Sequence, residues 1–375
     1  MTAQENWKIS STQDFLHPFP LESLVPQKSL KINFNSMGLG LNGGNRVILE
    51  LACRLQSKGH SVSINAIGKD GDAHWFGDLD GIQINFAFPS KITRLLHQKV
   101  RKQSFRDVQA ELLTEMVSDC DCDINIATYC LTADPTVKSG NGQLFYLVQN
   151  YEPLFFTDKR FITKAEKSYA LPLTKLCVSK WLQKKVGGIY IGNGVNTQIF
   201  HQQNKFNEKE QNSVLYLYRG IPWKGDYLAI ETLHHLFTLN PNTKIHIVAK
   251  NALPETGFPY ELHTNVSDKE LVKLYSKTKV LLYTSKFEGF GLPPLEALSC
   301  GTNVVSTNFE GNEYLVNGAN CLMAENKYDL ARQIQKLLSN DELAQEQLSE
   351  GSLTVKAFDF DEVVNRVLLA FGGSQ

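Results

Sequence analysis

The stretch 285–301, SKFEGFGLPPLEALSCG, constrains the fold of this chain more than any other part of the sequence. It follows a short apolar run at 280–284, which is typical of a buried strand in a parallel sheet. Pro293 and Pro294 fix the backbone for a first helical turn, and Gly301 can take the left-handed conformation that ends a helix. A buried strand, a glycine-rich loop and a short helix in this order indicate an α/β domain.

Two glycines and two glutamates give this stretch its chemistry. Gly289 and Gly291 lack side chains, so the backbone N–H groups of the loop can approach an anion, and the helix N-terminus adds a partial positive charge. Glu288 in the loop and Glu296 in the predicted first helical turn can accept hydrogen bonds from sugar hydroxyls. A simpler interpretation stays open at this point, in which the glycines serve only the backbone and Glu296 only complements the helix dipole.

The segment 287–318, FEGFGLPPLEALSCGTNVVSTNFEGNEYLVNG, resembles the C-terminal half of glycosyltransferase family 4. Members of that family carry two glutamates separated by seven residues around a GFGLP core, and Glu288 and Glu296 have this spacing here. The resemblance implies that Glu288 contacts the transferred sugar and that Glu296 contacts the ribose of the donor. It also implies that the loop binds the donor through Gly289, Phe290, Gly291 and Leu292.

The segment 218–225, YRGIPWKG, is similar to a second element of the same family, in which an arginine and a lysine precede a glycine. Arg219 and Lys224 have the family's spacing, which implies that they bind the donor diphosphate and form the catalytic set together with Glu288. Tyr218 stands where the family usually has glycine. Because two fixed cations already supply the charge that a metal would bring, we expect neither a metal ion nor another cofactor, with the nucleotide-diphosphate sugar as co-substrate.

A second glycine-rich loop lies near the start of the chain, between a predicted strand and a predicted helix. Gly38, Gly40 and Gly43 spell the GxGxxG pattern of dinucleotide-binding domains, which makes a nicotinamide-dependent oxidoreductase an alternative function. That function also needs an acidic residue at the end of the next strand, and the sequence has none there before Asp70. The glycine pattern alone therefore favours this alternative only weakly.

The resemblance to family 4 implies instead that Gly43 and Gly44 face the donor phosphates and that the acceptor lies nearby. A predicted strand at 144–148 ends in the segment 149–152, at the edge where α/β sheets place ligands. This segment, Gln-Asn-Tyr-Glu, is similar to one in polysaccharide-building members that include rhamnosyltransferases, although an asparagine replaces an aspartate. The acceptor-side candidates are Arg46, Asn150, Tyr151 and Glu152.

Two charged segments invite other interpretations. The segment 91–106 holds six basic residues and no acidic one, and it is either a solvated surface helix or a peripheral contact with an anionic membrane. Asp121 and Asp123 resemble the DxD metal clamp of the other large glycosyltransferase fold. We interpret them as part of a polar loop that enters a strand, because an apolar run begins directly after them.

Length and charge limit the remaining possibilities. A chain of 375 residues is too long for one typical core, so two domains are expected. The formal net charge of -1 gives no reason to expect a nucleic-acid partner. The sequence shows neither a signal-peptide pattern nor an apolar run of 18 residues, so we expect a cytoplasmic protein, peripheral at the inner membrane surface if 91–106 binds there.

These observations predict an α/β protein of the GT-B type, with two Rossmann-like doubly wound domains that face each other across a cleft. We expect an irregular extension at 1–29, an acceptor-side domain at 30–203 and a nucleotide-sugar domain at 204–357, with a C-terminal helix at 358–375 that crosses back. The expected function is a retaining, metal-independent hexosyl- or deoxyhexosyltransferase with a glycan, lipid-linked or other hydroxyl acceptor. A non-catalytic module that binds sugar nucleotides or glycans is the other alternative.

Overall fold

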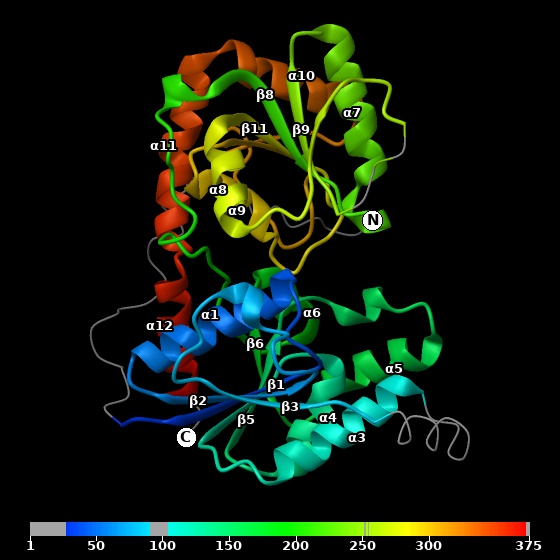
Figure 1. The fold of residues 1–375 in the computed structure, drawn as a ribbon, viewed down its shortest axis with the longest axis vertical. Helices are drawn as coiled ribbons and strands as arrows, with labels where there is room; N and C mark the ends of the chain where they lie inside the picture. Colours follow the sequence, from blue (N-terminus) through cyan, green and yellow to red (C-terminus); the bar gives the residue numbers. More distant parts are fainter. Residues whose placement is uncertain (1–27, 91–103, 251–252, 254, 373–375) are drawn as a thin grey trace, which may run out of the picture. The chain divides into compact units, whose positions relative to one another are not determined.

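The computed structural model describes residues 28–90, 104–250, 253 and 255–372 (Figure 1). Nearly all of the predicted extension 1–29 and most of the basic segment 91–106 lie outside these residues. The described chain divides into two compact units. We call them the N-terminal unit, residues 28–193 with 360–372, and the C-terminal unit, residues 194–359.

The contacts place residues 194–203 in the C-terminal unit, whereas the change in composition predicted a boundary after residue 203. The backbone N–H of Val195 donates to the carbonyl of Phe358 at 2.9 Å, and the ring of Phe200 lies 6.5 Å from that of Tyr275. Backbone pairing and aromatic packing with distant parts of the chain therefore set the boundary, and local composition does not reveal such contacts.

Within the described part of the N-terminal unit, seven parallel strands form one sheet in the order β3-β2-β1-β4-β5-β6-β7. The chain passes from β1 to β2 and β3 on one side and then returns to β4 on the other side of β1. Open α/β sheets bind ligands at the carboxyl ends of the strands where the order reverses in this way. The strands are β1 (Lys31–Ser36), β2 (Ser61–Ile67), β3 (Gln83–Ala87), β4 (Ile124–Ala127), β5 (Gln143–Val148), β6 (Thr174–Cys177) and β7 (Ile189–Tyr190).

Helices connect these strands. Asn42 caps α1 by accepting a hydrogen bond from the N–H of Asn45 at 2.9 Å. Near the C-terminus, α12 belongs to this unit and contacts α1, where Asp361 lies 3.0 Å from Arg54. The helices are α1 (Gly43–Ser57), α3 (Phe105–Ser118), α4 (Cys130–Ser139), α5 (Lys159–Ser168), α6 (Lys180–Val186) and α12 (Phe360–Gly372), with short 3-10 turns η2 (His74–Phe76) and η3 (Glu152–Phe155).

The described part of the C-terminal unit contains a second parallel sheet, with the order β10-β9-β8-β11-β12-β13. Here the order reverses between β8 and β11. The strands are β8 (Glu210–Leu217), β9 (Lys244–Val248), β10 (Glu261–His263), β11 (Thr278–Tyr283), β12 (Asn303–Ser306) and β13 (Leu322–Met323). The helices are α7 (Asp226–Leu239), α8 (Asp268–Lys277), α9 (Leu292–Ser299), α10 (Lys327–Ser339) and α11 (Asp341–Ala357), with 3-10 turns η4 (Phe206–Glu208) and η5 (Pro222–Lys224).

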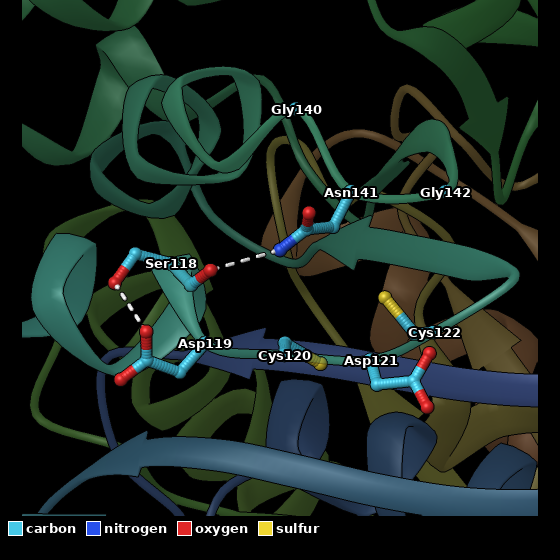
Figure 2. A pocket seen from close by; sticks show the side chains of 8 residues that line it. All are labelled: Ser118, Asp119, Cys120, Asp121, Cys122, Gly140, Asn141 and Gly142. Atoms are coloured by element: carbon cyan, nitrogen blue, oxygen red, sulfur yellow. Dashed lines mark hydrogen bonds between the residues drawn. The ribbon is translucent and has the colours of Figure 1, made fainter.

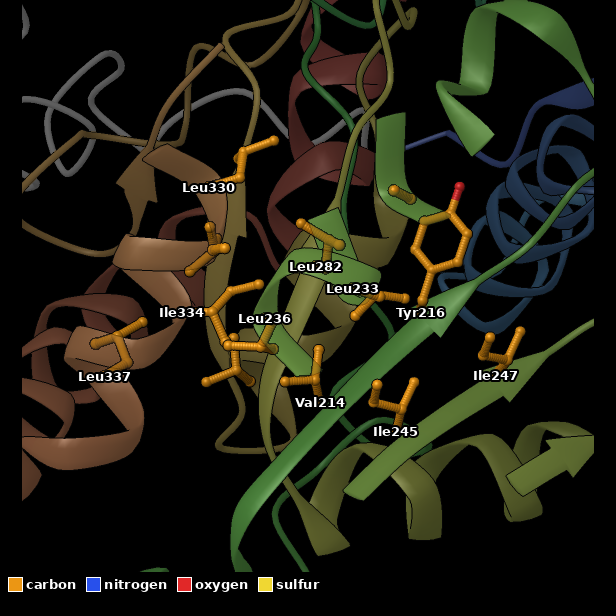
Figure 3. Close-up of a cluster of buried hydrophobic side chains, with 14 of the residues drawn as sticks. Val214, Tyr216, Leu233, Leu236, Ile245, Ile247, Leu282, Leu330, Ile334 and Leu337 are labelled. Atoms are coloured by element: carbon orange, nitrogen blue, oxygen red, sulfur yellow. The ribbon is translucent and has the colours of Figure 1, made fainter. Parts of the chain in front are cut away.

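The core of this unit lies between the sheet and two helices that pack against each other, α7 and α10 (Figure 3). Leu330, Ile334 and Leu337 recur every three or four residues along α10, so they share one face of the helix. They pack with strand residues that the sequence presents as continuous apolar runs, as expected for parallel strands buried on both faces. The labelled strand and α7 residues are Val214, Tyr216, Leu233, Leu236, Ile245, Ile247 and Leu282.

None of the helices among the described residues is both long enough and apolar enough to span a bilayer.

Candidate functional site

Two loops meet at the point where the strand order of the C-terminal unit reverses. The first loop, residues 218–225, follows β8, and the second, residues 284–291, follows β11. Because β8 and β11 are parallel neighbours, both loops leave the same edge of the sheet. This edge is where α/β sheets place ligands, and it carries both segments that resemble glycosyltransferase family 4.

An ion pair joins the two loops. Lys224 Nζ lies 2.6 Å from Glu288 Oε1, and the hydroxyls of Tyr283 and Ser285 each donate to the same oxygen at 2.7 Å. Burial, and then the charge of Glu288, raise the pKa of Tyr283 well above its ordinary value, so this hydroxyl keeps its proton and remains a donor. Among the described residues none donates to Glu288 Oε2, which leaves that oxygen available to a ligand hydroxyl.

Gly225 lets the two loops pack closely. Its φ of 74° is left-handed, and a Cβ at this position would lie 1.9 Å from the carbonyl oxygen of Thr284. The Thr284 hydroxyl donates to the Gly225 carbonyl at 3.1 Å, and the N–H of Lys286 donates to the Trp223 carbonyl at 2.9 Å. Only glycine fits here, and the packing that it permits brings Lys224 to the second loop.

Asp226 orders the backbone of the first loop. Its carboxylate accepts hydrogen bonds from the N–H groups of Arg219 at 3.1 Å and Ile221 at 3.0 Å, and from the hydroxyl of Tyr216 at 2.6 Å. The Arg219 side chain is exposed, and no acid among the described residues forms an ion pair with it. A guanidinium that is held by its backbone and has no carboxylate partner is well suited to bind a phosphate.

The backbone of the second loop supplies hydrogen-bond donors. Gly291 has a φ of 83° and precedes α9, whose N-terminus therefore begins inside the loop. Within the described chain, no acceptor takes a hydrogen bond from the backbone N–H groups that lead into α9. These four groups belong to Gly289, Phe290, Gly291 and Leu292. Unpaired N–H groups at a helix N-terminus form an anion site.

The structure shows how Phe290 and Glu296 are placed, which the sequence pattern alone did not predict. The Phe290 ring is buried and stacks on Tyr314 with ring centroids 4.6 Å apart, so only its backbone can face a ligand. Glu296 is the fifth residue of α9 and lies beyond the predicted first turn, because the helix begins at Leu292. Its Oε2 accepts a hydrogen bond from the Tyr275 hydroxyl at 3.2 Å.

Charge links Arg219 to the same region as Glu296. Burial, and then the charge of Glu296, raise the pKa of Tyr275 well above its ordinary value, while the positive charge of Arg219 opposes the rise. The charges of Glu296 and Arg219 therefore both act on the Tyr275 hydroxyl, although the two residues belong to different segments that resemble the family. Arg219, Lys224, Glu288 and Glu296 all lie on the loops or the helix at this edge of the sheet.

The predicted residues of the N-terminal unit form a separate group. Gly43 and Gly44 open α1, where a Cβ on Gly44 would lie 3.5 Å from the Gln149 amide oxygen. The Arg46 guanidinium lies one turn further, 5.5 Å from the centre of the Trp75 ring. All three positions follow the carboxyl end of β1, where the strand order of this unit reverses.

Asn150 and Tyr151 follow β5 and are half-buried, with the Asn150 side-chain oxygen accepting from the Tyr151 N–H at 2.8 Å. Glu152 is only 2% exposed. Its carboxylate accepts from the N–H of Cys130, the first residue of α4, at 2.5 Å and from the Tyr146 hydroxyl at 2.9 Å. Burial raises the pKa of Glu152 to about 7. These contacts give Glu152 a structural role at α4, and its predicted contact with an acceptor stays a prediction.

The comparison with protein families bears on the C-terminal unit, whose residues 197–352 match the model of "Glycosyl transferases group 1". Residues 197–352 are therefore similar to the group 1 glycosyl transferases. This segment contains both loops of the site, so the expected resemblance to a glycosyltransferase is confirmed.

Relatives with the same family name match parts of the chain. An uncharacterized glycosyltransferase from Methanocaldococcus jannaschii is 28% identical over 202 residues, which is 50% of this chain and 56% of the relative. The O-antigen chain mannosyltransferase B of Escherichia coli is 31% identical over 107 residues, or 28% of each chain. The chain thus spans little more than half of the first relative and about a quarter of the second. The expected likeness to rhamnosyltransferases stays a prediction.

Solved structures confirm the fold of this chain. Sucrose-phosphate synthase from Thermosynechococcus elongatus has a TM-score of 0.72 at 17% identity, covering 90% of this chain and 96% of its own. Anabaena HepE in complex with UDP-glucose has a TM-score of 0.71 at 15% identity, covering 90% and 98%. The α/β fold of the GT-B type is therefore the fold of this chain.

The acidic loop of the N-terminal unit lies at the amino ends of the strands, opposite the edge where α/β sheets bind ligands. Asp121 and Asp123 precede β4, and Lys31 at the start of β1 contacts both: its Nζ lies 2.5 Å from Asp121 and its N–H donates to Asp123 at 2.8 Å. Figure 2 shows the hollow beside them, in which the Asn141 amide donates to the Ser118 carbonyl at 3.1 Å. The structure thus places these acids in a loop that enters a strand.

Three residues that support the site were not identified from the sequence. Tyr283 and Ser285 hold the Glu288 carboxylate, and Asp226 holds the loop of Arg219. Asp226 follows directly after the Lys-Gly pair and could have been identified as a residue that caps a loop before a helix. Tyr283 ends an apolar run, and nothing in the local pattern distinguishes its hydroxyl from a core aromatic.

Proposed function

We propose that this group 1 glycosyl transferase is a retaining enzyme that moves a sugar from a nucleotide-diphosphate sugar to a hydroxyl acceptor. The observation that carries the proposal is the Lys224–Glu288 ion pair, which links the two loops at the point where the strand order reverses. It joins a cation suited to a phosphate with a carboxylate suited to a sugar, as sugar transfer from a diphosphate requires.

The negative charge that develops on the leaving diphosphate gives a role to the two cations and to the backbone N–H groups of the second loop. Breaking the anomeric bond gives the sugar oxocarbenium character and leaves negative charge on the departing diphosphate. Arg219, Lys224 and the unpaired N–H groups of residues 289–292 would stabilise that charge, since fixed donors need no reorganisation during the reaction. This charge set needs no metal ion, so we propose metal-independent transfer without a further cofactor.

The two glutamates take different roles in this proposal. Glu288 Oε1 is occupied by three donors, which disfavours it as a nucleophile, and its Oε2 would accept a hydroxyl of the transferred sugar. Glu296 would bind the donor ribose. Without a protein nucleophile, the acceptor hydroxyl would attack on the face that the diphosphate leaves, with the phosphate accepting its proton, and the anomeric configuration would be retained.

The relatives suggest the substrate class. Anabaena HepE is solved with UDP-glucose, and the Escherichia coli relative is an O-antigen chain mannosyltransferase. We therefore propose a hexose or deoxyhexose donor and a glycan or lipid-linked acceptor in polysaccharide synthesis. The acceptor would contact the N-terminal unit near Arg46, Asn150 and Tyr151. The cytoplasmic location and the membrane contact of 91–106 stay predictions.

A donor screen tests the proposal. The protein is incubated with a panel of nucleotide-diphosphate sugars, and release of the nucleoside diphosphate is measured with and without glycan acceptors. Product NMR then gives the anomeric configuration, and Glu288→Gln serves as the impaired control. Donor binding without release under any condition would instead support a binding module, and a product of inverted configuration would refute the retaining mechanism. A thermal shift with NAD(P)H but with no nucleotide sugar would support the oxidoreductase alternative.

A further inference from the structure

We propose that His246, Glu261 and His263 form a binding site for a divalent transition metal, most suitably zinc, on the sheet of the C-terminal unit. The site is distinct from the proposed active site. His246 lies inside β9 and the other two lie on β10, whereas the catalytic loops follow β8 and β11. The proposal goes beyond the glycosyltransferase function and does not depend on it.

Strand register brings the three side chains together. β10 pairs in parallel with β9, and Glu261 lies opposite His246. His263 is two residues beyond Glu261, so both side chains point to the same face of the sheet as His246. Residues that are 15 or more positions apart in the chain thus become neighbours through strand pairing.

The distances between donor atoms match those around a small metal ion. His246 Nδ1 lies 3.2 Å from His263 Nε2 and 3.3 Å from Glu261 Oε2, and His263 Nε2 lies 3.6 Å from Glu261 Oε1. Zinc binds nitrogen and oxygen ligands at about 2.1 Å, which separates two tetrahedral ligands by about 3.4 Å. The donors therefore already stand at ligand separations, so binding would require little movement.

A second carboxylate sets the orientation of His246. The Nε2 of this buried residue lies 2.7 Å from Glu210 Oε2. Glu210 Oε1 also lies 3.2 Å from the Nζ atoms of Lys244 and Lys277. A carboxylate acceptor at Nε2 favours a proton on that nitrogen, which leaves the lone pair of Nδ1 directed at His263 and Glu261. Metal-binding histidines commonly have such a carboxylate partner.

The site is closed on one side and open on the other. The His246 side chain is 2% exposed, that of His263 is 18% exposed and that of Glu261 is 59% exposed. Two imidazoles, one carboxylate and a solvent-facing fourth position make a ligand set that suits zinc.

Metal binding would stabilise the pairing of β10, the edge strand, with the rest of the sheet. β10 has three residues and is the last strand of the sheet, paired only with β9 within the described chain. A metal that bridges the two strands binds the folded unit and not the unfolded chain, so it would raise the thermal stability of the protein.

The test uses full-length protein that has been stripped with chelator and then titrated with zinc. We expect one zinc ion bound in calorimetry and an upward shift of the melting temperature. Glu261→Gln and His263→Gln should each weaken binding by at least about tenfold, because each removes one of three ligands, and Glu210→Gln should weaken it by about 10- to 100-fold through His246. His74→Gln is the matched control, since His74 is exposed and lies in the N-terminal unit, and it should bind zinc as the wild type does.

Cobalt spectroscopy identifies the ligand type, because the chain also contains seven cysteines. We expect visible bands of tetrahedral cobalt without the near-ultraviolet band of thiolate ligation. The proposal is overturned if the wild type binds no zinc, since a proton shared by the two histidines would then explain their contact. It is also overturned if both ligand variants bind zinc as tightly as the control, or if the cobalt spectrum shows thiolate ligands.

Discussion

The Lys224–Glu288 pair can be tested with a double-mutant cycle of Lys224→Met, Glu288→Gln and the double variant. The structure gives the reason to expect coupling: Lys224 Nζ contacts Glu288 Oε1 at 2.6 Å, and the two side chains are 25% and 9% exposed. Removing either partner therefore changes the position and the charge environment of the other. Both variants should fold, because Tyr283 and Ser285 still donate to residue 288.

The magnitude follows from the proposed roles. Loss of Lys224, one fixed donor to developing charge, costs about 3 kcal/mol of transition-state stabilisation, or about a hundredfold in kcat/KM, and we expect a loss of similar size for Glu288, the acceptor for the sugar. If both single variants lose this amount independently, the double variant should lose about 6 kcal/mol, or about 10⁴-fold. Groups in direct contact are usually coupled by about 0.5 to 3 kcal/mol, so we expect the double variant to lose only about 4 kcal/mol, or about a thousandfold.

The assay is steady-state release of the nucleoside diphosphate, with the donor varied and the acceptor saturating. Thermal unfolding of each variant separates loss of activity from loss of the fold. Lys286→Met is the matched control, because Lys286 is an exposed lysine of the loop that carries Glu288, and its activity should equal that of the wild type. Additive losses in the double variant would refute the coupling, and unchanged turnover in Lys224→Met would remove this residue from the proposed diphosphate site.

Three further predictions concern the glutamates and the metal requirement. Glu288→Gln should lower kcat at nearly constant KM, whereas Glu296→Gln should chiefly raise the donor KM, because only the sugar changes shape in the transition state; the reverse pattern would mean that the two roles are exchanged. Turnover should persist in excess chelator, even though the proposed zinc site would be emptied; a complete loss that magnesium or manganese restores would implicate Asp121 and Asp123 in metal binding. Burial raises the pKa of Glu152 from 4.5 to about 7, so the folded chain binds more protons in that range, and the contribution of Glu152 to stability is fully present below pH 4.5 and is lost as the pH rises to 7. Urea unfolding should show that this loss, about 3 kcal/mol, is absent from Glu152→Gln, and parallel pH profiles for the two proteins would contradict it.

The sequence by itself determined the local elements around the site. The apolar run before Glu288 predicted the strand β11, and the glycine and proline positions predicted a loop followed by a short helix. Gly301 has the expected left-handed φ of 72°, since backbone angles at such positions depend on the residue type. These predictions succeed because strand period, proline geometry and glycine freedom act over only a few neighbouring residues.

The tertiary structure decided which of these elements meet. Lys224 contacts Glu288, which is 64 residues further along the chain, because β11 pairs with β8 although β9 and β10 lie between them in the sequence. The same kind of long-range placement buries Glu152 at the start of α4 and brings His246 to β10. The sequence gives the chemical type of each of these side chains but not its surroundings in the fold. Its role depends on burial and on partners that only strand order and packing supply, because hydrogen bonds and ion pairs act across a few ångströms of space, whatever the separation along the chain.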